Sequence, residues 1–109
     1  MNDQHTTVDE LRGLLRQFVS ERDWEGFHTP KNLSMSIAIE AAELMEHFQW
    51  LTPDEALAVV DDPDKLAAVG EELADVVCYA LALTNALGLD LSSTVAAKMK
   101  KNAIKYPAG

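Results

Sequence analysis

Apolar residues recur at helical spacing along almost the whole chain. The first such stretch begins at Thr7, where the TVDE segment has the capping-box spacing with Glu10, and it runs toward residues 21–27. A glycine and a Thr-Pro pair then interrupt the pattern. The second stretch predicts a helix from about Asn32 to Trp50, with one apolar side.

The second half of the chain continues the helical pattern. A Thr-Pro pair opens a short helix over residues 52–60, because threonine caps a helix and proline suits its first turn. A long helix is expected over residues 64–87, with Gly88 as its C-cap. Asp90 or Ser92 can cap the last helix, which should end near Tyr106.

No segment alternates apolar β-branched residues with polar ones over the length of a strand. We therefore predict an all-α fold, a four-helix bundle formed by the whole chain, residues 1–109, as one domain.

Two of the predicted helices carry acidic residues on the side that should be buried. In the helix over residues 64–87, Glu72 falls inside the apolar arc and Asp75 at its edge. In the helix over residues 32–50, Glu40 falls inside the arc and Glu43 at its border. If these helices pack antiparallel, the four carboxylates converge.

Buried carboxylates need a partner, and no Lys or Arg lies between Lys65 and Lys98 to supply one locally. A hard divalent cation is the expected partner, because carboxylate oxygens are the ligands that Mg²⁺ and Mn²⁺ prefer. A carboxylate-bridged redox bundle is one alternative, although such bundles use Glu-x-x-His, and only His47 lies near an acidic pair. A helical interaction module with solvated acids is another.

Composition limits the classes of partner. The chain has 109 residues and a net charge of −9, which argues against a nucleic-acid surface and an anionic membrane. A core of this size is thin, so association with further copies is expected. The single cysteine, Cys78, the absence of a signal-peptide pattern and the short apolar runs predict a soluble cytoplasmic protein.

Positive charge gathers in the last helix. Lys98, Asn102 and Lys105 recur on one face, beside a stripe that includes Tyr106, and this suits a polyphosphate. A lysine-rich turn favoured by the helix dipole is the alternative. Tyr79 lies one turn after the second acidic pair, where it would reach a phosphate or pack in the core.

Both tryptophans, Trp24 and Trp50, lie at helix ends, where aromatic planes serve either as stacking platforms or as packing residues. Phe27 and His28 lie close to Trp24 and are further candidates for the same region.

Four ordered segments resemble the MazG-like all-α nucleoside triphosphate pyrophosphohydrolases, most closely the small single-domain branch that includes dCTP pyrophosphatase. The segments are FVSERDWEGFHTPKNL, IEAAELMEHFQW, EELADVVCYALAL and KMKKNAIKYP. The resemblance implies Mg²⁺-dependent cleavage of a nucleoside triphosphate to the monophosphate and pyrophosphate, in the service of nucleotide pool sanitation. It also implies a homo-oligomer, a tetramer built as a dimer of dimers.

The resemblance assigns roles to the candidate residues. The metal ligands would be Glu40, Glu43, Glu72 and Asp75. The substrate-binding residues would be Trp24, His28, Trp50, Tyr79, Lys98, Asn102, Lys105 and Tyr106. Glu43, as the more solvated acid of its helix, is the preferred general base.

One position departs from the resembling branch. The dCTP pyrophosphatases have a histidine in the first helix where this chain has Leu15. The two tryptophans would then set the width of a base slot without a hydrogen bond from this position. We expect a preference for deoxypyrimidines, first dCTP or a 5-substituted form, with weak discrimination between bases.

Overall fold

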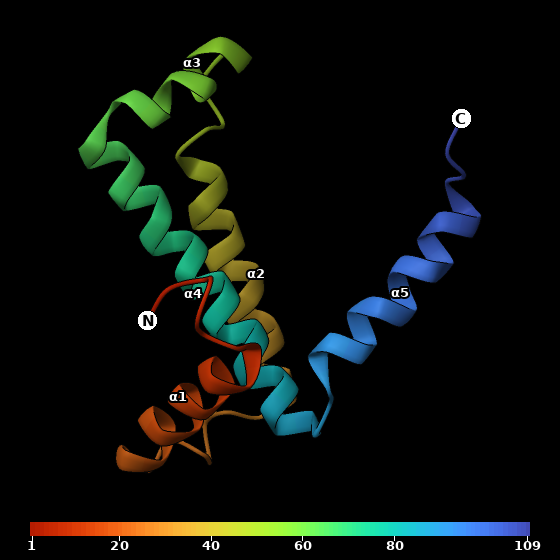
Figure 1. Cartoon of the computed structure of the whole chain (residues 1–109). Coiled ribbons are helices and arrows are strands. Elements are labelled where there is room, and N and C mark those ends of the chain that lie inside the picture. Colours follow the sequence, from red (N-terminus) through yellow and green to blue (C-terminus); the bar gives the residue numbers. More distant parts are fainter.

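The computed structural model describes all residues of the chain, 1–109, and every regular element in it is a helix (Figure 1). The elements in chain order are α1 (Val8–Glu21), α2 (Pro30–Glu46), α3 (Pro53–Leu57), the 3-10 helix η1 (Ala58–Asp61), α4 (Pro63–Leu87) and α5 (Leu91–Lys105). The prediction of an all-α fold with four main helices is confirmed. None of these helices has both the length and the apolar character that spanning a bilayer requires.

Side-chain caps fix where the helices begin. The Thr7 hydroxyl accepts a hydrogen bond from the Glu10 amide at 3.1 Å, and the Glu10 carboxylate completes the predicted capping box. At α5 the cap is Asp90, whose carboxylate accepts from the Ser93 amide at 3.0 Å. Gly88 ends α4 in the left-handed conformation, with φ of 64°, as predicted for a C-cap glycine.

The second helix is displaced from its predicted range. Thr29 caps it, so α2 begins at Pro30, two residues before the expected start. It ends at Glu46, and residues 47–50 form turns. Trp50 therefore lies beyond the helix that was expected to carry it.

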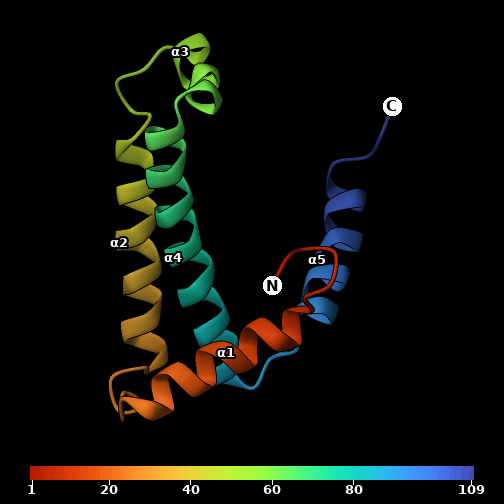
Figure 2. The ribbon, with the colours of Figure 1, turned by 60° about the vertical axis from the view of Figure 1, so that its left-hand side comes forward.

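The helices α2 and α4 form an antiparallel pair, as the two views together show (Figures 1 and 2). The segment α3 and η1 connects them at one end, and α1 crosses the other end. This arrangement fulfils the condition under which the two acidic pairs converge.

Three hydrogen bonds attach α1 to the C-terminal end of α4. The side-chain oxygen of Asn85 accepts from Arg12 Nε at 3.0 Å and from Arg16 Nη1 at 2.8 Å. In return, the Asn85 amide nitrogen donates to the Arg12 carbonyl oxygen at 3.1 Å. These bonds fix how α1 crosses α4.

The helix α5 lies apart from the other helices (Figures 1 and 2). The predicted four-helix bundle therefore does not close within one chain. The apolar stripe of α5 is open to solvent, with Val95 50% and Met99 59% exposed. The radius of gyration is 16.5 Å, whereas a compact domain of similar length has about 13 Å.

Candidate metal centre and adjoining pockets

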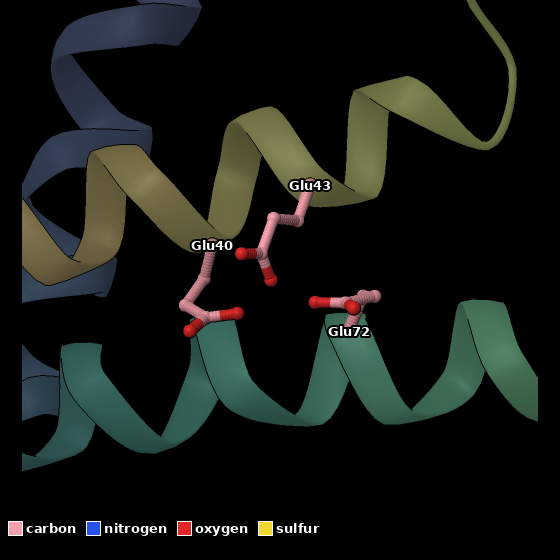
Figure 3. Close-up of side chains that lie close together, drawn as sticks. All are labelled: Glu40, Glu43 and Glu72. Atoms are coloured by element: carbon pink, nitrogen blue, oxygen red, sulfur yellow. The ribbon is translucent and has the colours of Figure 1, made fainter.

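Three carboxylates from two helices meet in the seam between α2 and α4. Glu40 and Glu43 extend from α2 toward Glu72 of α4 (Figure 3). Each residue offers one carboxylate oxygen, and these atoms all lie within 4.8 Å of one another. Residues three apart on a helix share a face, so α2 presents both of its acids to the single one across the seam.

Two of the carboxylate oxygens are buried without a partner. Glu40 Oε2 and Glu72 Oε2 are inaccessible to solvent and make no hydrogen bond. The salt bridge of the chain joins Arg22 to Glu21 at 3.8 Å, so no basic side chain neutralises the acids of the seam. Buried unpaired carboxylate oxygens are costly, and a hard cation would satisfy them. The donor set, all oxygen, fits Mg²⁺ or Mn²⁺.

Burial and the close approach of these acids raise the pKa of Glu40. Loss of hydration raises the pKa of Glu40 to about 7, and the neighbouring carboxyl groups of Glu43 and Glu72 add to this shift. The charges of Glu43 and Asp75 act in the same direction. A cation in the seam would oppose this shift, because it would favour the ionised carboxylate.

The fourth predicted ligand, Asp75, lies outside the group of three. It follows Glu72 by one turn of α4, and its charge reaches Glu40. Its side chain lines a pocket of about 400 Å³ between α1 and α4. Asp75 thus connects the carboxylate seam with this pocket. Glu43 is exposed, whereas Glu40 and Glu72 are half-buried, as the border position of Glu43 predicts.

We call this cavity the apolar pocket. It is lined by Leu14, Leu15, Phe18, Val19, Trp24, His28, Asp75, Cys78, Tyr79 and Ala82. The ring of Trp24 meets that of Phe18 edge to face, with centroids 5.7 Å apart, and this contact orients the indole. The pocket offers an aromatic edge and aliphatic walls, the lining typical of a pocket for a flat organic ring.

A smaller cavity of about 270 Å³ adjoins the apolar pocket. Its lining residues are Trp24, Phe27, His28, Asn32, Leu33, Ser36 and Tyr79, and we call it the side pocket. Trp24, His28 and Tyr79 belong to both cavities. A third cavity of about 530 Å³, which Arg16 and Asn85 line, contains no acid of the seam.

Comparison with known proteins identifies the family of this chain. The MazG-like family model matches residues 35–109, which include all four predicted acids. The chain belongs to the MazG-like family.

Relatives of this MazG-like chain include two mammalian enzymes. The chain is 42% identical over 102 residues to human dCTP pyrophosphatase 1 and 41% identical over 101 residues to the mouse protein. These matches cover 94% and 93% of the chain, but 60% and 59% of the relatives. The chain thus spans about 60% of the length of the curated relatives it matches.

A solved relative matches the fold over its full length. The crystal structure of a pyrophosphatase from Archaeoglobus fulgidus has a TM-score of 0.87 and 41% sequence identity to this chain. The match covers 99% of each chain. The relationship therefore includes α1 and α5 as well as the central helix pair.

Five of the predicted substrate residues lie away from the seam in this MazG-like chain. They are Trp50, which is 86% exposed, and the residues Lys98, Asn102, Lys105 and Tyr106 at the α5 end of the chain. Trp50 follows the C-terminal end of α2, whereas Trp24 precedes its N-terminal end. Since α2 has 17 residues, about 25 Å of helix separates the two ends.

Sequence reasoning missed several residues of the two pockets. Leu14, Phe18 and Cys78 were not predicted as site residues, because their convergence depends on how α1 crosses α4. Ser36 was not singled out. Its signal was available, because it lies one turn before Glu40 on the same helix.

Proposed function

We propose that the chain is a Mg²⁺-dependent nucleotide pyrophosphohydrolase that converts (deoxy)nucleoside triphosphates to the monophosphate and pyrophosphate. The observation that carries this proposal is the pair of buried, unpartnered oxygens of Glu40 and Glu72, next to a pocket of about 400 Å³. The names of the relatives, dCTP pyrophosphatase and pyrophosphatase, support the same reaction.

The metal would be held by Glu40, Glu43, Glu72 and Asp75. Asp75 lies one turn from Glu72 on the same helix, and its charge already acts on Glu40, so it would complete the ligand set. Mn²⁺ would substitute, because it takes the same oxygen ligands. When bound, Mg²⁺ supplies charge neutralisation for the phosphate oxygens and lowers the pKa of a bound water.

Glu43 is the acid placed to accept a proton from the attacking water, because it is exposed at the border of the seam. The water oxygen forms a bond to one of the two phosphorus atoms that flank the α–β bridge. The bond from that phosphorus to the bridging oxygen then breaks. The proton passes to Glu43, and pyrophosphate and the nucleoside monophosphate leave. Glu40 and Glu72 hold charge near the phosphates and take no proton in this scheme.

The base would occupy the apolar pocket. Trp24 offers an aromatic surface there, and Leu15 contributes an aliphatic wall without a hydrogen-bonding group. Such a pocket selects by size more than by the polar edge of the base. We infer a preference for deoxypyrimidine nucleotides, dCTP or a modified dCTP first, with modest discrimination among them.

The remaining substrate residues would come from a second copy of the chain. The helix α5 lies apart from α2 and α4 (Figure 1), so Lys98, Asn102, Lys105 and Tyr106 would contact phosphates held in the seam of a neighbouring copy. The exposed stripe on α5 is suited to pack on another subunit. We infer a homo-oligomer, a tetramer built as a dimer of dimers, in which Trp50 and α5 complete a neighbour's site.

Pyrophosphate release from a panel of nucleotides, with and without Mg²⁺, tests the reaction. Glu72→Gln should abolish release while the far-UV circular dichroism stays unchanged. Glu71→Gln is the matched control, because Glu71 is the exposed neighbour outside the carboxylate group. Release independent of Mg²⁺, or near-normal activity of Glu72→Gln, would contradict the proposal. Uptake of iron with colour on oxidation would indicate a redox bundle instead.

A further inference from the structure

The side pocket differs from the apolar pocket in its chemistry. Besides Trp24 and His28, which it shares with the apolar pocket, its lining includes Asn32, Ser36 and Tyr79, so an amide and two hydroxyl groups border a small cavity. Asn32 donates its amide to the Phe27 carbonyl at 3.1 Å, which leaves the Asn32 side-chain oxygen as an acceptor. A site with these groups suits a ligand that carries hydroxyls.

Two half-buried hydroxyls in this pocket have no partner within the chain. The Ser34 hydroxyl donates to the Lys31 carbonyl at 2.8 Å, and the Thr84 hydroxyl to the Leu81 carbonyl at 2.7 Å. This local bonding is usual for serine and threonine in a helix. Ser36 and Tyr79 make no such bond, and both line the side pocket. Their hydroxyls are available to a ligand.

The side pocket lies within a helical turn of the carboxylate seam. Ser36 precedes Glu40 by four residues on α2, a rise of about 6 Å. Tyr79 follows Asp75 by the same interval on α4. The two hydroxyls therefore approach the end of the seam from opposite helices, and Tyr79 also borders the apolar pocket.

We propose that Ser36 and Tyr79 bind the 3′-hydroxyl of the nucleoside sugar, with Asn32 closing the same subsite. This inference rests on the proposed function, which puts the phosphates at the carboxylates and the base in the apolar pocket. The sugar joins those two parts, and the side pocket adjoins both sites. The 3′-carbon neighbours the carbon that carries the phosphate arm, whereas the 2′-carbon neighbours the base. The side pocket borders the seam through Ser36, one turn of α2 from Glu40, so it is placed to meet the 3′ side of the sugar.

Substrates that lack one hydroxyl test this assignment directly. We would measure kcat/KM for dCTP and for 2′,3′-dideoxycytidine triphosphate with the unmodified protein and with Ser36→Ala. The variant should lose about 3- to 10-fold with dCTP, the effect of one hydrogen bond. It should show no loss with the dideoxy substrate. Alanine is a good helix former, so α2 should remain intact.

Matched variants separate this role from general packing. Ser34→Ala removes a hydroxyl from the same helix that bonds only to the backbone, so both substrates should be unaffected. Tyr79→Phe should repeat the pattern of Ser36→Ala. An equal loss with both substrates, or no loss with either, would overturn the assignment. A greater loss with CTP than with dCTP would move the contact to the 2′-hydroxyl and would also overturn it.

A binding measurement distinguishes failure of this subsite from failure of the proposed reaction. An α,β-methylene analogue of dCTP and its 3′-deoxy form cannot be cleaved at the α–β bridge, and their affinities in Mg²⁺ are measurable by calorimetry. If pyrophosphate release is absent but Ser36→Ala still weakens only the analogue with the 3′-hydroxyl, the subsite stands and the reaction is wrong. If Ser36→Ala changes neither affinity, the subsite is wrong whatever the reaction.

Discussion

Arg12 and Asn85 hold each other by two hydrogen bonds in opposite directions. Arg12 Nε donates to the Asn85 side-chain oxygen, and the Asn85 amide donates to the Arg12 carbonyl oxygen. The first bond joins two side chains and the second reaches the backbone of α1, so the crossing of α1 over α4 is restrained in position and orientation. Because α1 supplies one wall of the apolar pocket, this pair also holds that wall in place.

Replacing Asn85 with Ala should weaken this crossing. The change removes the shared acceptor of Arg12 and Arg16 in a partly buried place, so we expect the free energy of unfolding to fall by about 1–3 kcal/mol. Urea denaturation at one fixed protein concentration measures it. Gln17→Ala is the control, because Gln17 bonds to Glu21 on the exposed side of α1. Equal effects of the two changes would contradict a special role for Asn85.

The turn after α1 contains a residue in a conformation that favours glycine. Asp23 has φ of 54°, and the following Trp24 amide closes the turn on the Val19 carbonyl at 3.0 Å. Asp23→Gly should relieve the strain and raise the free energy of unfolding by about 0.5–1 kcal/mol.

The reciprocal change at the end of α4 is its control. Gly88 has φ of 64° and no atom within 4 Å of an added Cβ, so Gly88→Ala introduces backbone strain without a clash. It should lower the free energy of unfolding by about 1 kcal/mol. If both changes shift the melting temperature in the same direction, the conformational argument is wrong.

The pKa of Glu40 predicts how the stability of the metal-free protein depends on pH. The folded-state pKa of about 7 lies above the ordinary glutamate value of 4.5, so the folded state binds more protons than the unfolded state between these pH values. The free energy of unfolding should therefore fall as pH rises from 4.5 to 7 and then level off. Thermal melts in EDTA test this, and Glu40→Gln should remove that part of the slope. A Glu40→Gln profile as steep as the original would exclude Glu40 as its source.

Mixing two inactive variants tests whether one subunit completes the site of another. Glu72→Gln removes a carboxylate, and Lys98→Ala removes a predicted phosphate contact on α5. If these residues act in the same site from different subunits, an equal mixture that exchanges subunits has about one quarter of its sites intact. Activity should then recover to about that fraction. No recovery after verified exchange would place both residues in the site of one chain.

Trp50→Ala tests the second stacking surface. Trp50 is 86% exposed in the single chain, so its removal should not unfold the subunit. Loss of a stacking partner is worth about 1–3 kcal/mol per base, so KM should rise about 10-fold for every nucleotide that the protein accepts. Trp50→Phe should retain most of the affinity. A rise in KM for one base alone would indicate edge recognition in place of stacking.

Local chemistry made much of this fold predictable. Thr7 with Glu10, and Asp90 with Ser93, fix helix starts through bonds between neighbours in sequence, and Gly88 fixes an end in the same way. The convergence of Glu40 with Glu72 followed from periodicity alone once the two helices packed antiparallel. The end of α2 was missed because no breaker stands between Glu46 and the Thr-Pro pair at residues 52–53.

Other features depend on which partner covers an apolar face, and periodicity does not carry that information. The stripe through Val95 and Met99 reads as a buried face whether it packs on its own chain or on another copy. The apolar pocket likewise depends on the angle at which α1 crosses α4, which the Asn85 hydrogen bonds fix across more than sixty positions of sequence.

Only 6 of the 109 residues are buried in the single chain. A single chain would be readily degraded by proteases or bound by chaperones. So little buried surface does not offset the conformational entropy that the backbone loses on folding. If the proposed oligomer forms, assembly would act as a quality checkpoint during synthesis, because a subunit would become stable and active only after it binds other copies. Catalytic activity per chain would rise with expression level rather than stay constant. A variant that fails to assemble would be degraded in the cell although its catalytic side chains are unchanged.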